Sequence, residues 1–329
     1  MKRFLVTNFA PVMARGVPGT GGTPDYTYSG GDDKRIPIAF AKKTILKFYD
    51  SCVVSQVTNT DYSGEVTAQG DKVVMNTTPT ITIYPVTRNM APVWQTPTSD
   101  SVTMTVDRAI GFAFRMDKID LKQFLNKQFM EDCAGDAAQQ QKIYIDTEFL
   151  EDIYSDAAAA NIGLTAGAKS ASYNMGVSGT PFPVTRTNII DKMLEMEGIG
   201  DEANWPESGR WVVLPSHYAV MLKQSDIKDA SMMGDGTSTL RTGKIGKLGN
   251  LNIYTTNLYT AHTDTYSCYY VLFGHQSSTC FVSQLIDTEY FDKLESVQSG
   301  KGMKGTQVYD WKVVKPESLG YLYSYKAQA

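Results

Sequence analysis

The sequence predicts an α+β fold, in which one long helix and several strands lie along the same chain. In residues 117–163, apolar side chains recur every four positions, which is the periodicity of a helix with one apolar face. In residues 72–84 and 101–116, apolar and polar residues alternate, as is typical of strands. After residue 185, short strand-like and helix-like stretches follow one another, which favours a mixed α+β domain.

Composition places the chain among ordinary globular proteins. The 329 residues suffice for one large domain or two smaller ones, and 42% of them are hydrophobic and 20% charged. No apolar run reaches the roughly 18 residues of a membrane span. Only three apolar residues follow Met1-Lys2-Arg3, too few for a secretory signal. The expectation is a chain without membrane contact.

Cysteine spacing and charge exclude further classes of site. The four cysteines show no CxxC spacing, so we expect buried free thiols in a reducing compartment instead of disulfides or a zinc site. They are Cys52, Cys133, Cys268 and Cys280. The net charge of −4 argues against a dedicated nucleic-acid binder. Residues 1–50 carry eight Lys and Arg against four Asp and Glu, so this basic stretch precedes an acidic remainder. Contact with an acidic neighbour is one interpretation, and a solvated tail without a partner is the other.

The first part of the chain reads as an arm, a helix and a long ribbon. Residues 11–33 are rich in Gly, Pro and Thr and lack the apolar surface to fold alone, which predicts an extended arm. Residues 39–57 have helical periodicity. The stretches 72–84 and 101–116 would pair as a ribbon, which is marginal in water without outside support. Trp94 near its tip is therefore predicted to anchor an interface, or else to be core if the ribbon folds back.

The stretch 117–163 is predicted to be a spine helix. A continuous helix of about 40 residues at ~1.5 Å each would be ~60 Å long. The alternative is two ordinary helices broken near Gly135. The acidic pairs Glu131/Asp132 and Glu151/Asp152 fall on the polar side and read as a solvated face.

The second half predicts a separate α+β domain after a Gly/Ser/Ala loop at 164–183. The predicted elements are a helix at 185–197 with Gly198 as its C-cap, a buried strand at 210–214, a helix capped by Ser216 that runs to Ala230, a loop at 232–250, strands at 251–259, 269–275 and 279–285, and a returning strand at 306–314.

A search for chemistry finds no catalytic constellation. His217, His262 and His275 have no partner at metal-ligand spacing, which favours structural or surface roles. GxSxG, HExxH and DxDxDG patterns are absent. The Gly-rich stretch 243–249 is no P-loop, because Lys244 is followed by an isoleucine instead of Ser or Thr. We therefore expect no enzyme activity, no cofactor and no metal.

Several segments, in this order, resemble a known family. GDKVVMNTTPTITIYPV (70–86) with SVTMTVDRAIGFAFRMDKID (101–120) looks like an extended loop that leads into a spine helix. RWVVLPSHYAVMLKQ (210–224), GKIGKLGNLNIYTTNLY (243–259) and KVVKPESLGYLY (312–323) look like the axial-domain and closing segments of the same family. The chain is thus similar to the major capsid protein of tailed double-stranded-DNA bacteriophages, with the Hong Kong ninety-seven-type capsid fold.

The resemblance implies a domain plan. It consists of an N-terminal arm (1–40), an arm helix (41–61), an extended hairpin loop (62–110), a peripheral domain with the spine helix (111–180), an axial domain (181–285) and a return strand of the peripheral domain (286–329). The predicted contacts between subunits are Arg88, Trp94, Arg241, Lys244 and Lys247.

The resemblance also implies function and partners. Copies would form hexamers and pentamers that close into an icosahedral head shell around double-stranded DNA, which lies near the protein without specific recognition. A scaffolding protein, a portal protein and a decoration or cement protein are the implied partners. The implied location is the virion, after assembly in the host bacterial cytoplasm. An encapsulin-like bacterial compartment shell is the alternative, and an enzyme is the distant one.

Some members of this family weld subunits together through a Lys–Asn isopeptide bond. Here Lys72 is the only lysine between residues 48 and 117, and it lies at the base of the ribbon. Residues 288–329 contain no Asn. Acceptors elsewhere, such as Asn126 or Asn257, remain open. We expect a shell held without covalent links.

Overall fold

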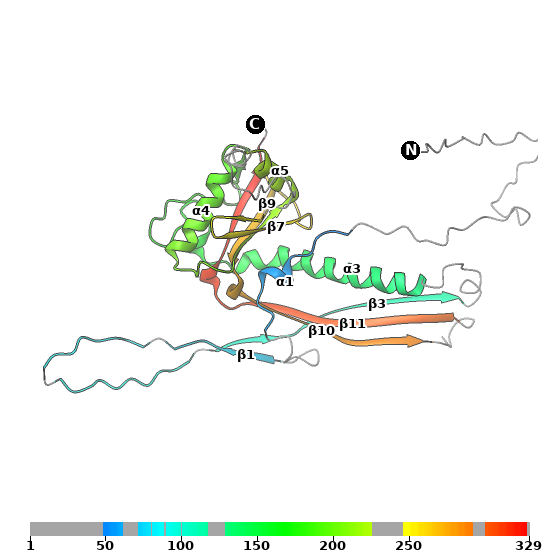
Figure 1. Cartoon of the computed structure of the whole chain (residues 1–329), viewed down its shortest axis with the longest axis horizontal. Coiled ribbons are helices and arrows are strands. Elements are labelled where there is room, and N and C mark those ends of the chain that lie inside the picture. Colours follow the sequence, from blue (N-terminus) through cyan, green and yellow to red (C-terminus); the bar gives the residue numbers. More distant parts are fainter. Residues whose placement is uncertain are drawn as a thin grey trace, which may run out of the picture. The chain divides into compact units, whose positions relative to one another are not determined.

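The structure is a computed structural model of the chain (Figure 1). It describes residues 49–61, 72–79, 81–88, 90–99, 101–117, 129–225, 246–291 and 300–327. All of them belong to the second of two compact units, Ile45–Ala329. The predicted arm at 1–40, most of the helix predicted at 39–57, and the predicted contacts Arg241 and Lys244 lie outside the described residues. The described part mixes helices with strands, which confirms the α+β class.

The first sheet is three-stranded and antiparallel, with the order β10-β11-β3. Its strands are β3 (Arg108–Asp117), β10 (Thr279–Phe291) and β11 (Gly300–Val313). Helix α3 (Phe129–Asp152) lies along this sheet (Figure 1). Its buried side chains Ile145 and Phe149 share one apolar cluster with Tyr309 and Trp311 of β11. Burial of this shared face holds the helix on the sheet.

The second sheet has seven strands and its own core. The order is β4-β12-β9-β5-β7-β6, and β8 pairs with β9. The strands are β4 (Phe182–Val184), β5 (Arg210–Pro215), β6 (Lys247–Leu248), β7 (Leu251–Thr256), β8 (His262–Thr263), β9 (Ser267–His275) and β12 (Leu319–Lys326). Helices α4 (Ile189–Glu202) and α5 (Ser216–Gln224) contribute buried side chains to this core. All six residues of β5 are buried, as predicted for the stretch 210–214.

The third sheet is a short ribbon. Its strands β1 (Lys72–Asn76) and β2 (Ser101–Thr105) pair antiparallel, from Lys72 opposite Thr105 to Asn76 opposite Ser101. The predicted strand 72–84 is therefore too long, because the described residues between 77 and 99 have no regular secondary structure. Only the base of the predicted ribbon has a strand ladder among these residues.

The predicted strand 101–116 is two strands in different sheets. β2 ends at Thr105, and β3 begins at Arg108. Between them Val106 is fully buried, and the Asp107 N–H donates to Asp310 Oδ2 at 3.1 Å instead of joining a ladder. The alternating pattern continues across this break, so the prediction was wrong about continuity but right about strand conformation.

The predicted spine is a helix that passes through Gly135 without a break. α3 runs continuously from Phe129 to Asp152, so the alternative of two helices broken near Gly135 is wrong. Its 24 residues span about 36 Å, and the predicted end at Gly163 is also wrong. Two 3₁₀ turns follow instead, η2 (Ile153–Asp156) and η3 (Ala159–Asn161). The Asn161 side-chain amide donates to the carbonyls of Glu317 and Leu319, which bonds the chain after α3 to the start of β12.

The predicted C-cap glycine of α4 lies inside the helix. α4 begins at Ile189 and continues to Glu202, so Gly198 does not end it. A Cβ at Gly198 would lie 2.9 Å from the Tyr173 hydroxyl, and one at Gly200 would lie 2.7 Å from the Trp205 ring. Both glycines therefore serve close packing instead of helix termination.

The C-terminal strand corrects the predicted domain plan. β12 pairs antiparallel with β9 and parallel with β4, so residues 319–326 belong to the seven-stranded sheet and not to a peripheral return strand. Ala166 and Met175, from the predicted boundary loop, are fully buried in the core of the same sheet. β10 and β11 form the three-stranded sheet with β3, and β11 pairs directly with β3.

Other boundaries shift by a few residues. Ser216 is the first residue of α5 and does not cap it, and α5 ends at Gln224. β10 continues past the predicted end at 285 to Phe291. In the described part of the helix predicted at 39–57, only α1 (Val54–Val57) is helical. The four cysteines are free thiols, as predicted, although Cys52 and Cys133 are only partly buried.

Candidate interaction surface

The stretch between β1 and β2, which we name loop 77–99, exposes a concentration of large apolar side chains. Residues 80 and 89 of this loop lie outside the described residues. Trp94 is 89% exposed and Ile83 is 87% exposed. Ile81, Val86, Met90 and Val93 are also exposed. Trp94 is therefore not a core residue of this chain, which removes the alternative in which the ribbon folds back.

Side chains join the two legs of loop 77–99. The Gln95 amide both accepts from the Thr82 N–H at 3.0 Å and donates to the Thr82 carbonyl at 2.6 Å. The Tyr84 hydroxyl accepts from the Val93 N–H at 2.8 Å. These bonds hold the legs in register without a backbone ladder between the described residues, and they leave the apolar side chains in solvent.

The base of the ribbon, in contrast, has an apolar core. Val73 and Met75 of β1 pack with Met104 of β2 and with Val106 just beyond it. Cys280, Val282 and Val308 of β10 and β11 complete this cluster. The ribbon is therefore fixed to the three-stranded sheet at its base, while the described residues of loop 77–99 include no buried large apolar side chain.

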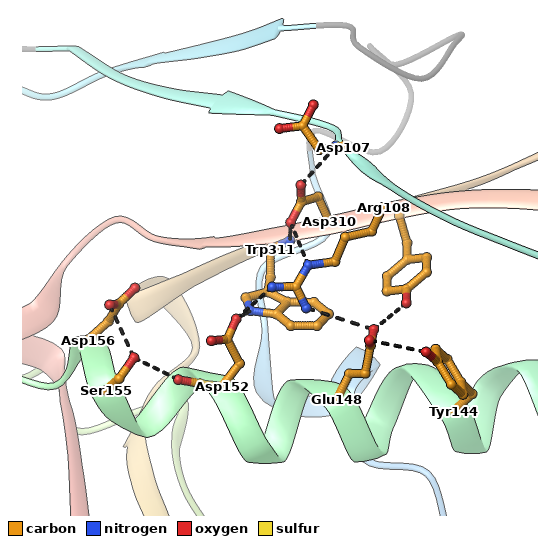
Figure 2. Close-up of polar contacts among 10 residues, drawn as sticks. Asp107, Arg108, Tyr144, Glu148, Asp152, Ser155, Asp156, Asp310 and Trp311 are labelled. Atoms are coloured by element: carbon orange, nitrogen blue, oxygen red, sulfur yellow. Dashed lines mark hydrogen bonds and ion pairs between the residues drawn. The ribbon is translucent and has the colours of Figure 1, made fainter.

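A charged cluster centred on Arg108 supports the same junction (Figure 2). The Arg108 guanidinium lies over the Trp311 ring, 3.8 Å from its centroid, and Nη2 is 2.7 Å from Asp152 Oδ2. Glu148 at 3.8 Å and Asp310 at 3.7 Å complete its set of ion pairs. Arg108 opens β3, two of the acids belong to α3, and Asp310 belongs to β11. One cation thus links three elements that are distant in sequence.

The acids of this cluster are positioned by further donors. The Trp311 indole N–H donates to Asp152 at 3.0 Å, and the Tyr309 hydroxyl donates to Glu148. Burial and the Glu148 carboxylate raise the pKa of Tyr309, so this phenol remains a donor. Asp310 accepts from the backbone N–H groups of Asp107 and Trp311. Figure 2 shows these side chains converging between α3 and the strands.

The predicted solvated face of the second acidic pair is confirmed, because Glu151 and Asp152 are both exposed. Asp152 also bonds Arg108 and Trp311 from this exposed position. Glu151 accepts from the Thr260 hydroxyl. Glu131 and Asp132 are exposed, as predicted. No sequence signal identified Arg108, because its partners lie on elements far away along the chain.

The predicted contact residues lie in two places. Arg88 and Trp94 are both exposed on loop 77–99. Lys247 is exposed on β6, at the edge of the seven-stranded sheet.

The histidines are built into the seven-stranded sheet and its surroundings. His275 contacts the Ser208 carbonyl and the Ser277 hydroxyl through its two ring nitrogens, both at 2.8 Å. His262 packs edge-on against Tyr270, and His217 packs against Tyr218. Among the described residues no group of three His, Cys, Asp or Glu side chains could hold a metal ion. None of the described helices is long and apolar enough to cross a membrane.

Comparison with known proteins gives matches in structure alone. No protein-family model matches the chain, and no curated protein matches it in sequence. A solved structure from Mycobacterium phage Che8 matches with a TM-score of 0.64 and 19% identity, over 88% of this chain and 97% of that one. The capsid structure of cyanophage P-SCSP1u matches with a TM-score of 0.62 and 12% identity, over 98% of this chain and 100% of that one. A chain of the mature capsid of bacteriophage PhiM1 matches with a TM-score of 0.59 and 14% identity, over 89% of this chain and 93% of that one.

These matches cover 88 to 98% of this chain and 93 to 100% of the matched chains. At 12 to 19% identity they report the path of the backbone and not a close common sequence. The chain therefore has the fold of phage capsid proteins, as its resemblance to that family implied.

Proposed function

We propose that this chain is the major capsid protein of a tailed bacteriophage. Copies assemble into hexamers and pentamers, and these close into an icosahedral head shell around double-stranded DNA. The observation that carries the proposal is the match over 98% of this chain and the whole of the P-SCSP1u capsid chain. Fold alone does not imply function, so the proposal also needs a surface suited to assembly.

Loop 77–99 is that surface. A soluble monomer rarely concentrates so many large apolar side chains on one exposed segment, and such patches mark protein interfaces. Trp is among the residues that most often dominate binding energy, and Trp94 is nearly fully exposed. A fixed base and an apolar tip suit a loop that reaches another subunit. The surface that covers the loop would belong to a second copy of this chain.

The two larger sheets fit a division into two parts. The three-stranded sheet with α3 corresponds to the peripheral domain, and the seven-stranded sheet with α4 and α5 corresponds to the axial domain. With the corrections above, the axial domain also includes residues 319–326 and much of 164–180. Lys247, on the edge strand of the axial sheet, stays a proposed contact between subunits.

The remaining partners follow from the same proposal. A scaffolding protein would guide assembly, a portal protein would occupy one vertex, and a decoration or cement protein would bind the finished shell. The protein would be located in the virion and assembled in the host bacterial cytoplasm. No catalytic role is proposed. The encapsulin-like alternative receives no specific support from the matches.

Negative-stain electron microscopy of the expressed full chain tests the proposal, with and without a co-expressed scaffolding protein. Closed shells of uniform diameter are the expected result. A chain that stays monomeric, or forms only irregular aggregates under both conditions, would overturn it. The Trp94→Ala chain serves as a control, because it should keep its fold and lose particles.

A further inference from the structure

Residues 49–59, which we name the strap, are bonded to both larger sheets. The Ser51 hydroxyl donates to the Thr255 carbonyl at 2.6 Å, and the Thr256 hydroxyl donates to the Ser51 carbonyl at 3.0 Å. At its other end, Asn59 exchanges backbone hydrogen bonds with Thr279 and Phe281, each at 2.9 Å. β7 belongs to the seven-stranded sheet and β10 to the three-stranded sheet. The strap therefore connects the two layers.

The middle of the strap is held by one buried carboxyl group. Asp146, in the C-terminal third of α3, is only 4% exposed. Its Oδ2 accepts from the Val53 N–H at 2.5 Å and from the Val54 N–H at 3.3 Å. Both valines are buried in the cluster that also contains Ile145 and Phe149. A polar group thus anchors the strap inside an apolar junction.

This carboxyl group is held by neutral donors instead of a cation. Among the residues that the structure describes, no Lys or Arg forms an ion pair with Asp146. Two N–H groups are its hydrogen-bond partners, fewer than a carboxylate obtains in water. An ionised carboxylate in such a place loses hydration that the partners replace only in part.

We propose that Asp146 is a proton-operated clasp on the strap, which holds the strap more firmly when the carboxyl group is protonated and loosens when it ionises. The clasp is separate from the proposed capsid function, since it operates within one chain.

The direction of the effect follows from the charge. Burial raises the pKa of Asp146 from 3.8 to about 6, and the hydrogen bonds from Val53 and Val54 lower it only in part. The folded strap therefore holds a proton that the opened strap, with a hydrated carboxyl group, releases between about pH 4 and 6. Strap stability is highest below this window and is lost as the pH rises through about 6.

Other titratable groups near the strap can be separated from Asp146 by their pKa or by a control variant. Burial raises the pKa of the Cys52 thiol to about 11, so Cys52 stays neutral in this range; besides Asp146, the charges of Lys142 and Asp50 act on this thiol. On the side of the seven-stranded sheet, burial raises the pKa of Tyr259 well above its usual range. His275 precedes Gln276, whose amide donates to the Gln56 carbonyl of the strap at 2.9 Å, so this histidine needs a control of its own.

Hydrogen exchange at the Val53 and Val54 amides of the unassembled full chain tests the clasp. Protection factors, corrected for intrinsic exchange, are compared at about pH 5 and about pH 7.5. We expect protection to fall about tenfold at the higher pH, which is the part above pH 5 of a full range of about 100-fold set by two pKa units. Asp146→Asn should keep high protection at both pH values. Asp146→Ala removes the acceptor and should give low protection at both.

Two matched variants serve as controls. Glu131→Gln changes an exposed acid on the same helix, and His275→Gln removes the neighbouring histidine; both should keep the pH profile of the wild type. Protection that does not change with pH in the wild-type chain would overturn the proposal, as would an Asp146→Asn chain with an unchanged profile. Loss of the profile in His275→Gln would assign the effect to the histidine and also overturn it. None of these outcomes depends on particle formation.

Discussion

Trp94 and Trp311 have opposite surroundings in the same chain. Trp94 is 89% exposed on loop 77–99, whereas Trp311 is 7% exposed, lies under the Arg108 guanidinium and donates to Asp152. A tryptophan that lies in solvent contributes little to the stability of the chain that carries it. Such a tryptophan contributes instead to the free energy of binding to the partner surface that buries it.

We therefore predict that Trp94→Ala impairs assembly and spares folding. The unfolding free energy of the monomer should stay within about 1 kcal/mol of the wild type, as for other surface changes. Loss of a contact anchor should weaken association by ~2 kcal/mol or more. Trp311→Ala is the matched control and should destabilise the monomer by about 3–5 kcal/mol. Urea unfolding and particle yield are the measurements. A strongly destabilised Trp94→Ala monomer with normal particle yield would contradict the prediction.

Arg108 is the other residue on which the ribbon junction depends. Its removal leaves Glu148, Asp152 and Asp310 close together without a cation and uncovers the Trp311 ring. We predict that Arg108→Ala destabilises the chain by about 1–3 kcal/mol, because charged hydrogen bonds and a stacking contact are lost together.

Arg108→Lys separates charge from shape in this cluster. Lysine keeps the positive charge but lacks the planar fork that stacks on Trp311 while bonding Asp152, so it should recover only part of the loss. Urea unfolding of the three chains at low and high salt measures both contributions, since salt screens the charge and spares the stacking. Equal stability of all three chains would show that the cluster does not hold the junction.

At the scale of elements, glycines in two helices have opposite roles. A Cβ added at Gly135 in α3 would meet nothing within 4 Å, whereas a Cβ at Gly200 in α4 would lie 2.7 Å from the Trp205 ring. A glycine in open helix surface only lowers helix propensity. The absence of a side chain at Gly200 allows the Trp205 ring to pack directly against α4.

Substitution by alanine should therefore change stability in opposite directions. Gly135→Ala should stabilise the chain by up to about 1 kcal/mol, because alanine has the higher helix propensity. Gly200→Ala should destabilise it by about 1–3 kcal/mol, since the ring of the buried Trp205 must move. Thermal unfolding of the two variants beside the wild type measures both. Destabilisation by Gly135→Ala would contradict the prediction, because it would mean that a side chain at this position has no free space.

At the scale of the whole molecule, the ribbon carries no lysine for a covalent Lys–Asn bond at its tip. Lys72 is at the start of β1, at the base of the ribbon, and the described residues of loop 77–99 contain no lysine. Residues 288–329 contain no Asn. Contacts of the loop and of neighbouring subunits would then hold the proposed shell by packing and charge alone.

We predict that mature particles boiled in detergent release a single band near 36.3 kDa. Non-covalent contacts do not survive these conditions, whereas an isopeptide bond does. Particles treated with and without reducing agent form the control for disulfides between the free cysteines. A ladder of multimers that persists in reducing agent would reveal a covalent link and contradict the prediction.

The sequence by itself determined local conformation and the order of the elements. Alternation marked the strand character of 101–116, a continuous apolar run marked the buried strand β5, and four-residue spacing marked α3. These patterns depend on neighbours along the chain, because side-chain direction repeats with the period of each element. The arrangement of characteristic segments also led from the sequence to the capsid fold, which the structural matches confirm.

Tertiary structure alone decided what each element pairs with. The break at Val106 is invisible in the alternating pattern, because β2 and β3 differ in their hydrogen-bond partners and not in conformation. Gly135 did not break α3, since apolar packing of Ile145 and Phe149 outweighs a helix-propensity loss of ~1 kcal/mol. The Arg108 cluster and the burial of Asp146 join residues from distant parts of the chain. Such contacts depend on how the sheets and helix meet in space, and no local periodicity encodes them.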